Sequence, residues 1–202
     1  MPGTDGSRGS VSRRAFLLAG AGIAVGGVVM AETGFLGNRP LFAGTLQAAP
    51  GNVTLVNYAN DGKRLGTVTV PTLIKSNAAW HQQLSPIGYA VTRQGGTETP
   101  FTGPLNDNYK PGLYRCICCA TALFSSKTKY DPKEGWPSFW QVLTTQNVIL
   151  RTDLSLGMDR TEVRCKRCAA HLGHRFPDGP PPTGLRYCMD SAALAFVPAA
   201  QI

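Results

Sequence analysis

Cys116-Ile117-Cys118-Cys119 and Cys165-Lys166-Arg167-Cys168 are the two segments that set the framework of the fold. Each contains a Cys-x-x-Cys knuckle, which bends so that both sulfurs point at one ion, and two knuckles complete a tetrahedral site. The paired spacing predicts a structural zinc ion bound by Cys116, Cys119, Cys165 and Cys168. Two disulfides are the alternative, which an exported destination makes more plausible. Cys118 is then either a small buried residue or a second redox thiol.

Short runs of β-branched and apolar residues surround the knuckles. The 202 residues include 23 Gly and 15 Pro, and only 16% are charged, which is typical of turn-rich β structure. The chain is therefore predicted to be mainly β, with short β-like runs from Tyr89 onward. One short helix is expected from its N-cap Ser76 to Leu84, before Pro86. A hairpin is expected from residues 53–56 and 67–70, and further strands are expected over residues 113–115, 148–152, 161–164 and 194–197.

The sixth cysteine, Cys188, stands apart from the knuckles, in Thr183-Gly-Leu-Arg-Tyr-Cys-Met-Asp-Ser191. Side chains alternate between the faces of a strand, so Arg186, Cys188 and Asp190 are expected on one face. A guanidinium beside a thiol favours the thiolate, which is the nucleophilic form. This arrangement predicts an enzyme with Cys188 as its nucleophile.

The first fifty residues are typical of an export leader. Ser12-Arg13-Arg14 is a twin-arginine pattern, followed by an uncharged Gly/Ala-rich stretch over residues 15–30. This stretch is short for a bilayer span, which needs about 20 apolar residues. We interpret residues 1–50 as a signal peptide and linker and expect a periplasmic protein. An uncleaved leader that anchors the chain to the membrane is the alternative.

The net charge of +8 gives little reason to expect nucleic-acid binding. Four of the arginines, at positions 8, 13, 14 and 39, belong to the leader and linker. The other basic residues are scattered and form no Lys/Arg run flanked by aromatic residues. Nucleic acid is therefore not an expected partner.

Several ordered motifs, spread over residues 80–197, together resemble one family. They are Val91-Thr-Arg-Gln-Gly-Gly-Thr-Glu98, Pro100-Phe-Thr-Gly103, Gly112-Leu-Tyr-Arg-Cys116, Leu123-Phe-Ser-Ser126, Gly135-Trp-Pro-Ser-Phe139, His171-Leu-Gly-His-Arg-Phe-Pro-Asp-Gly-Pro180, Pro182-Thr-Gly184 and Arg186-Tyr-Cys188. The chain is similar to the methionine-R-sulfoxide reductases of the B type. The resemblance implies a β-tent-like fold, in which two small antiparallel sheets pack together and carry a zinc site. Residues 76–202 would form this domain, and residues 51–75 a hairpin extension.

The resemblance also implies a reaction. The Cys188 thiolate would attack the sulfur of a methionine-R-sulfoxide in an oxidised protein, become a sulfenic acid, and be restored by a thioredoxin-like thiol donor. The oxygen must be protonated as it leaves, and His171 and His174 titrate in the useful range. Trp136 and Phe176 are expected to wall the pocket around the S-methyl group. Asp178 is expected to orient Arg186 or a histidine.

Two positions depart from the pattern of that family. Asp190 stands where Asn is usual, and an added carboxylate is expected to raise the pKa of Cys188 unless Arg186 neutralises it. Alternatively, Asp190 stays protonated and donates to the sulfoxide oxygen. Glu134 stands where many relatives place a resolving cysteine. We therefore expect a donor thiol to attack the sulfenic acid directly, with Cys118 as the alternative resolving thiol.

Two other functions compete with this interpretation. A zinc-ribbon-type interaction module without catalysis explains the knuckles but not Cys188, the paired histidines or Trp136. A structural domain held together by disulfides predicts neither zinc nor free thiols.

Overall fold

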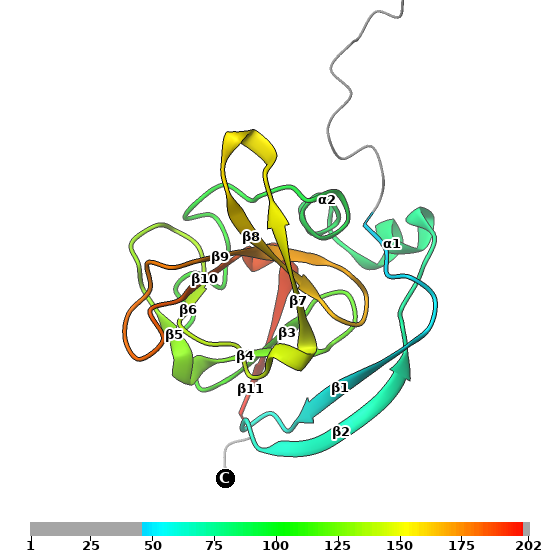
Figure 1. Ribbon diagram of the computed structural model, residues 1–202, viewed down its shortest axis with the longest axis horizontal. Helices are drawn as coiled ribbons and strands as arrows, with labels where there is room; N and C mark the ends of the chain where they lie inside the picture. Colours follow the sequence, from blue (N-terminus) through cyan, green and yellow to red (C-terminus); the bar gives the residue numbers. More distant parts are fainter. Residues whose placement is uncertain (1–45, 200–202) are drawn as a thin grey trace, which may run out of the picture. The chain divides into compact units, whose positions relative to one another are not determined.

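Short strands dominate residues 46–199, the part of the chain that the computed structural model describes (Figure 1). The strands are β1 (Asn52–Tyr58), β2 (Arg64–Pro71), β3 (Gly112–Cys116), β4 (Ala122–Ser125), β5 (Lys129–Tyr130), β6 (Ser138–Phe139), β7 (Val148–Asp153), β8 (Arg160–Cys165), β9 (His171–Phe176), β10 (Arg186–Met189) and β11 (Leu194–Pro198). The helices are α1 (Asn77–Gln83) and α2 (Pro86–Gln94), with 3-10 turns η1 (Ser126–Thr128), η2 (Thr145–Asn147), η3 (Ser155–Gly157) and η4 (Ser191–Ala193).

The strands pair into three antiparallel sheets. Strands β5-β6-β10-β9-β8-β7 form a six-stranded sheet, β11-β3-β4 a three-stranded sheet, and β1-β2 a separate hairpin. The mainly β prediction with two antiparallel sheets is confirmed, and the strands expected around the knuckles are β3, β7, β8 and β11. In Figure 1 the β7–β8 hairpin (yellow) projects beyond the strands around it.

Aromatic side chains join the two larger sheets. Phe124 of β4 stacks on Phe139 of β6 with ring centroids 4.4 Å apart, and Tyr114 of β3 meets Phe139 edge-on at 4.9 Å. Tyr187 of β10 packs against Phe124 at 5.8 Å. All four rings are buried, and contacts of this kind stabilise a core beyond the area they bury. This packing holds β10, and with it the Cys188 backbone, against the core.

The hairpin β1–β2 is bound to the rest of the structure by Asn147, whose side chain is fully buried. The Val56 N–H donates to Asn147 Oδ1 at 2.8 Å, while Asn147 Nδ2 donates to the carbonyl oxygens of Val56 at 2.9 Å and Ala122 at 2.8 Å. One amide thus links β1 to η2 and β4, which lie beside the hairpin (Figure 1).

One helix was expected near residue 80, and two are present. Helix α1 follows the prediction, since the Ser76 hydroxyl caps it by accepting from Ala79 N–H at 3.2 Å. The expectation of β-like runs from Tyr89 onward is wrong for residues 89–94, which belong to α2. Ser85 caps this helix, Pro86 occupies its first turn and Gly95 ends it in the left-handed conformation with φ 71°. These are ordinary helix boundary signals.

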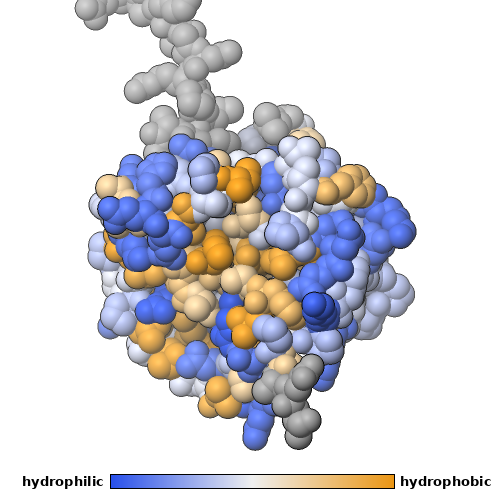
Figure 2. Space-filling view, turned by 180° about the vertical axis from the view of Figure 1, so that it is seen from behind, coloured by the Kyte–Doolittle hydropathy of each residue, from blue (hydrophilic) through white to orange (hydrophobic). Residues whose placement is uncertain are grey.

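Some large hydrophobic side chains lie on the surface. Ile87 and Phe101 are exposed, and seen from behind, hydrophobic residues gather near the middle of one face (Figure 2). A groove of about 460 Å³ is lined by residues of α2, η4 and the loop after residue 98. Apolar surface of this kind is common where proteins contact one another.

The predicted leader lies almost wholly in residues 1–45, outside the described part of the chain, so the twin-arginine interpretation stays a prediction. Among residues 46–199, neither helix has the length and apolar character that crossing a bilayer requires.

Candidate active site

The two histidines of His171-Leu-Gly-His174 reach one face of β9 because the strand is irregular there. Residues three apart on a regular strand point to opposite faces. Here Val163 pairs with Gly173 and Arg164 with His171, so Leu172 is an extra residue, and Gly173 has φ +139°. A Cβ on Gly173 would lie 2.1 Å from the carbonyl oxygen of Cys188, so only glycine fits. The two imidazole rings then lie 5.2 Å apart.

Cys188 opens into a cavity of about 160 Å³. Its neighbours across the sheet are His174 on β9 and Ser138 on β6, and its side chain is only partly buried. Arg186, Cys188 and Asp190 all line this cavity, as strand alternation predicts. The other lining residues are Thr97, Glu134, Trp136, Arg160, Gly173, His174, Phe176 and Met189.

Arg186 is held by two carboxylates. Its Nε and Nη2 atoms donate to the two oxygens of Asp178 at 2.9 and 2.8 Å, as the orienting role expected for Asp178 requires. Its Nη1 atom donates to Glu134, and its guanidinium lies 4.5 Å from the ring centre of Phe176. Asp178 raises the pKa of Arg186 further above its usual value. The cation is therefore fixed and already paired with carboxylates.

The resting form of Cys188 differs from what its neighbour Arg186 led us to expect. Burial raises the pKa of the Cys188 thiol to about 11, and the opposing effect of Arg186 is too small to reverse this. The carboxylates of Glu134 and Asp190 raise the pKa as well, while a hydrogen bond with Ser138 lowers it. At neutral pH the thiol is therefore protonated when the cavity is empty. Strand alternation locates Arg186 but does not reveal its partners.

Each histidine is paired with a carboxylate that sequence reasoning missed. His171 Nδ1 lies 2.8 Å from Glu162 Oε1, and His174 Nε2 lies 2.8 Å from Asp153 Oδ2. Both carboxylates come from the β7–β8 hairpin, 9 and 21 residues before their histidines, and the pairing of Glu162 with His174 across β8 and β9 brings this hairpin beside them. His174 lines the thiol cavity, whereas His171 lines a second cavity of about 110 Å³.

Asp190 is nearly fully buried and follows directly after β10. Its Oδ1 atom accepts from the backbone N–H of Glu98 at 2.8 Å, and its Oδ2 atom lies 4.0 Å from Nε2 of His171. Burial raises the pKa of Asp190 to about 6. Glu98, the last residue of the Val91–Glu98 motif, is a further carboxylate here, and it accepts from the backbone N–H groups of Ser191 and Ala192 at 2.5 and 2.8 Å.

The expected aromatic walls are present. Trp136 is half-buried at the thiol cavity, and its Nε1 atom donates to the carbonyl oxygen of Glu98 at 3.1 Å. Phe176, also half-buried, lines the same cavity and packs against Arg186. The hydrogen bond fixes the plane of the indole ring, which offers a polarizable face for contact with a sulfur-bearing side chain.

The four knuckle sulfurs gather in one place and fit a tetrahedral ion. Sγ atoms of Cys116, Cys119, Cys165 and Cys168 all lie within 4.8 Å of one another. The closest pairs, Cys119–Cys165 at 3.4 Å and Cys116–Cys168 at 3.7 Å, are too far apart for disulfides, which need about 2.05 Å. Zinc–sulfur bonds of about 2.3 Å place tetrahedral ligands about 3.8 Å apart.

A buried arginine gives independent support for a metal ion between these four sulfurs. Arg93 is fully buried, and its Nη1 atom donates to the carbonyl oxygen of Cys168 at 3.1 Å. Within residues 46–199 it forms no ion pair with a carboxylate. A buried cation requires a compensating negative charge. Four thiolates around one divalent ion carry two negative charges, whereas two disulfides carry none, so the donor set fits zinc.

Cys118 is buried and its thiol contacts the sulfurs of Cys116 and Cys168. It belongs to the neighbourhood of the knuckles and does not line the cavity of Cys188.

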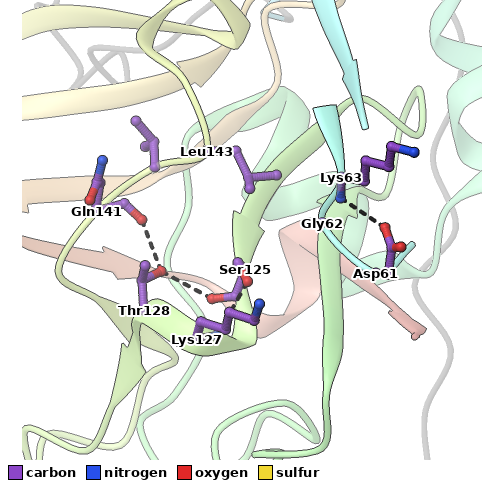
Figure 3. A pocket seen from close by; sticks show the side chains of 9 residues that line it. Asp61, Gly62, Lys63, Ser125, Lys127, Thr128, Gln141 and Leu143 are labelled. Atoms are coloured by element: carbon purple, nitrogen blue, oxygen red, sulfur yellow. Dashed lines mark hydrogen bonds between the residues drawn. The ribbon is translucent and has the colours of Figure 1, made fainter. Parts of the chain in front are cut away.

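A wider groove of about 490 Å³ lies between the β1–β2 turn and residues 125–128 and 141–143 (Figure 3). Its side chains are mostly polar, including Asp61, Lys63 and Lys127, and they include no cysteine or histidine. The groups capable of redox chemistry lie in the smaller cavity around Cys188.

Comparisons with known proteins show the family of the chain. The SelR domain family matches residues 84–198. A peptide methionine sulfoxide reductase MsrB of Thioalkalivibrio sulfidiphilus is 51% identical over 138 residues, which cover 68% of this chain and 96% of the relative. The MsrB of Thiobacillus denitrificans is 54% identical, and the match covers 61% of this chain and 94% of the relative. The MsrB of Agrobacterium fabrum is 48% identical, and the match covers 66% of this chain and 99% of the relative. With its motifs, its cysteine cluster and these similarities, the chain belongs to the SelR domain family of B-type methionine-R-sulfoxide reductases.

Proposed function

We propose that this protein reduces methionine-R-sulfoxide in oxidised proteins to methionine and so repairs oxidative damage. The observation that carries the proposal is the Cys188 thiol, which is free, partly buried and open to a cavity with an aromatic wall. Five of the six cysteines lie at the two knuckles, so Cys188 alone is available for chemistry at this cavity. Membership of the SelR domain family supports the same reaction.

The reaction transfers oxygen between two sulfur atoms. Cys188 Sγ attacks the sulfoxide sulfur, the sulfur–oxygen bond of the substrate breaks, and the oxygen ends on Cys188 as a sulfenic acid. The substrate sulfur gains two electrons and Cys188 loses two, so no other oxidant or reductant takes part. Because the resting thiol is protonated, its proton must leave as the sulfur attacks.

The cavity suits a sulfoxide on an exposed methionine. Trp136 supplies an apolar face for the S-methyl group, while the fixed cation of Arg186 lies on the face that holds Cys188. Arg186 thereby favours the thiolate that forms during attack, although it does not produce one at rest. The cavity of about 160 Å³ has room for the end of one methionine side chain.

Recycling is proposed to use an external thiol. Glu134 stands at the position of the resolving cysteine of many relatives, and Cys118 lies among the knuckle sulfurs. A thioredoxin-like donor thiol attacks the sulfenic acid and releases water, and a second donor thiol then breaks the mixed disulfide and restores Cys188. Mass spectrometry of the oxidised protein tests this step, and a Cys118–Cys188 disulfide would overturn it.

We also propose that the knuckles hold structural zinc and that the protein is exported to the periplasm by its twin-arginine leader. The sulfur geometry and the buried Arg93 support the first proposal. The Ser12-Arg13-Arg14 pattern supports the second. Cell fractionation of the wild type and an Arg13→Lys/Arg14→Lys variant tests export, which this change should abolish if the route is correct.

The activity is tested with peptides that carry either the R or the S sulfoxide, with dithiothreitol as reductant. Wild type should turn over the R form only, and Cys188→Ser should abolish turnover. Cys118→Ser serves as the matched control and should stay active, because Cys118 lies outside the cavity. Equal turnover of both epimers, or turnover by Cys188→Ser, would refute the proposed function.

A further inference from the structure

Proton transfer is the part of the proposed reaction that the thiol cavity leaves unassigned. The inference below rests on the proposed function and deepens it. The thiol of Cys188 must lose its proton as its sulfur attacks, and the sulfoxide oxygen must gain one before it leaves its sulfur. One group near both atoms is able to perform both transfers if it is a weak acid that lines the cavity.

The histidines are poorly placed for this task. His171 does not line the thiol cavity. His174 lines it, but its Nε2 atom is bound to Asp153 at 2.8 Å. Burial also lowers the pKa of His174, so its ring carries no extra proton to donate at neutral pH.

The other charged groups of the cavity are bound in ion pairs. Arg186 is held by Asp178 and Glu134. Arg160 is paired with Asp153 through a contact of 2.8 Å. A guanidinium does not give up its proton in a protein, and a carboxylate paired with one is held in its charged form. Two carboxyl groups line the cavity, Glu134 and Asp190. Glu134 is bound to Arg186, whereas the basic group recorded beside Asp190 is the imidazole of His171, with Nε2 4.0 Å from Oδ2.

The geometry of Asp190 suits a proton carrier. It follows Cys188 by two residues on the same face of the chain. Its Oδ1 atom is fixed by the backbone N–H of Glu98, which leaves Oδ2 free to bind a proton. The closest basic atom is His171 Nε2 at 4.0 Å, which is buried and has no hydrogen-bond partner in the described structure. Asp190 and Cys188 line the same cavity, and catalytic hydrogen bonds are often long before substrate binds.

We propose that Asp190 carries the thiol proton of Cys188 to the sulfoxide oxygen. As Sγ attacks, the S–H bond breaks and the proton moves to Asp190 Oδ2. The same proton then passes to the sulfoxide oxygen, which becomes the hydroxyl of the Cys188 sulfenic acid. The substrate leaves as a thioether and Asp190 returns to its starting charge, so the step consumes no proton from solvent.

The surroundings of Asp190 support this role. Burial raises its pKa to about 6, the hydrogen bond from the Glu98 N–H and the His171 ring lower it, and the Glu98 carboxylate raises it. A group that titrates near the working pH accepts and releases protons with a small penalty in either direction. The charged and titratable side chains that face it, or share its cavity, are Glu98, Glu134, Arg160, His171, His174, Arg186 and Cys188.

The proposal predicts how the rate of oxygen transfer depends on pH. Two forms of the site contain the same number of protons. One has a protonated Asp190 and a Cys188 thiolate, and the other has a charged Asp190 and a Cys188 thiol. The rate of the wild type should therefore be nearly constant between the two pKa values, at about 6 and about 11. Without the carboxyl group, only the thiolate reacts. Its fraction, and hence the rate, rises about tenfold per pH unit below the thiol pKa.

The experiment is a single turnover without reductant, in which methionine formed from a methionine-R-sulfoxide peptide is measured against pH. Asp190→Asn is the test variant, because the amide keeps the acceptor for Glu98 N–H. Asp61→Asn makes the same chemical change at an exposed turn and should retain the wild-type profile. Over about two pH units above neutrality, the wild-type rate should change less than about threefold, while that of Asp190→Asn should rise about a hundredfold.

The possible outcomes distinguish a failure of this proposal from a failure of the proposed function. A rate for Asp190→Asn that differs from wild type by one constant factor at every pH would show a structural role and overturn the proposal. The same profile in both proteins would overturn it too. A wild type that forms no methionine would instead refute the proposed function. The melting temperature of the variant confirms that it is folded.

Discussion

Asn147→Ala should release the N-terminal hairpin from the domain. The hairpin, residues 52–71, lies outside the region matched by the SelR domain family, residues 84–198, so its contribution to the fold rests on its own contacts. Asn147 supplies three of them, two to Val56 and one to Ala122, at 2.8–2.9 Å. Its amide uses both donor hydrogens and the carbonyl oxygen, so alanine leaves three buried backbone groups without their partners.

The magnitude follows from these three groups. A typical hydrogen bond contributes about 1 kcal/mol net, and a buried group left unpaired costs about 1–3 kcal/mol. We therefore expect the free energy of unfolding to fall by about 3 kcal/mol or more. In a domain of this size, a loss of about 3 kcal/mol corresponds to a melting temperature lower by about 6–12 °C.

Urea denaturation measures the loss, and hydrogen exchange of the Val56 amide shows where it occurs. Gln146→Ala is the matched control: the neighbouring side chain is exposed, so its removal should change stability by no more than about 0.5 kcal/mol. A loss below about 1 kcal/mol for Asn147→Ala, with Val56 still protected from exchange, would refute this reasoning.

Two further predictions concern the metal site and the thiol. Removing metal with a chelator, or the change Cys119→Ser, should lower the melting temperature, because metal binding at a four-cysteine site is part of the folding free energy. Calorimetry with metal analysis measures this effect. An unchanged melting temperature in metal-free protein would contradict the prediction. Glu134→Gln and Asp190→Asn should each lower the pKa of Cys188, because each removes a carboxylate that raises it. The rate of thiol alkylation against pH measures that value, and a rise or no change would count against the charge assignment.

Much of the site could be predicted from sequence because its constraints are local. A Cys-x-x-Cys unit brings its own two sulfurs together, and strand alternation places Arg186, Cys188 and Asp190 on one face whatever the surrounding fold. The four-cysteine cluster and the residues of the thiol cavity therefore follow from short patterns. The β1–β2 hairpin likewise follows from β-branched runs on either side of a turn.

Helix α2 was missed for a physical reason. Its polar residues Thr92 and Arg93 are buried, whereas the apolar Ile87 is exposed, so the apolar residues do not mark the buried face of this helix. The boundary signals, Ser85-Pro86 at the start and Gly95 at the end, were the information available, and they outweigh the β-branched composition between them.

Side-chain partners contributed by other strands could not be predicted. The carboxylates Glu162 and Asp153 come from a hairpin that precedes the histidines, and they meet them only through the register of β8 and β9. The protonation state of Cys188 depends on burial and on the ion pairs of Arg186, which appear only when the chain is folded.

The protonated thiol changes how the selectivity of the site is understood. Arg186 is bound by Asp178 and Glu134, so its charge is balanced before any substrate arrives, and burial keeps Cys188 neutral. A neutral thiol is a weak nucleophile and resists general oxidants. A sulfoxide differs from other electrophiles because its oxygen needs the proton that the thiol must lose. A carboxyl group that passes this proton between the two sulfur centres, as proposed for Asp190, would therefore activate the thiol mainly when a sulfoxide is bound. Burial thus keeps the resting cysteine unreactive, and the Asp190 carboxylate favours its reaction with the substrate.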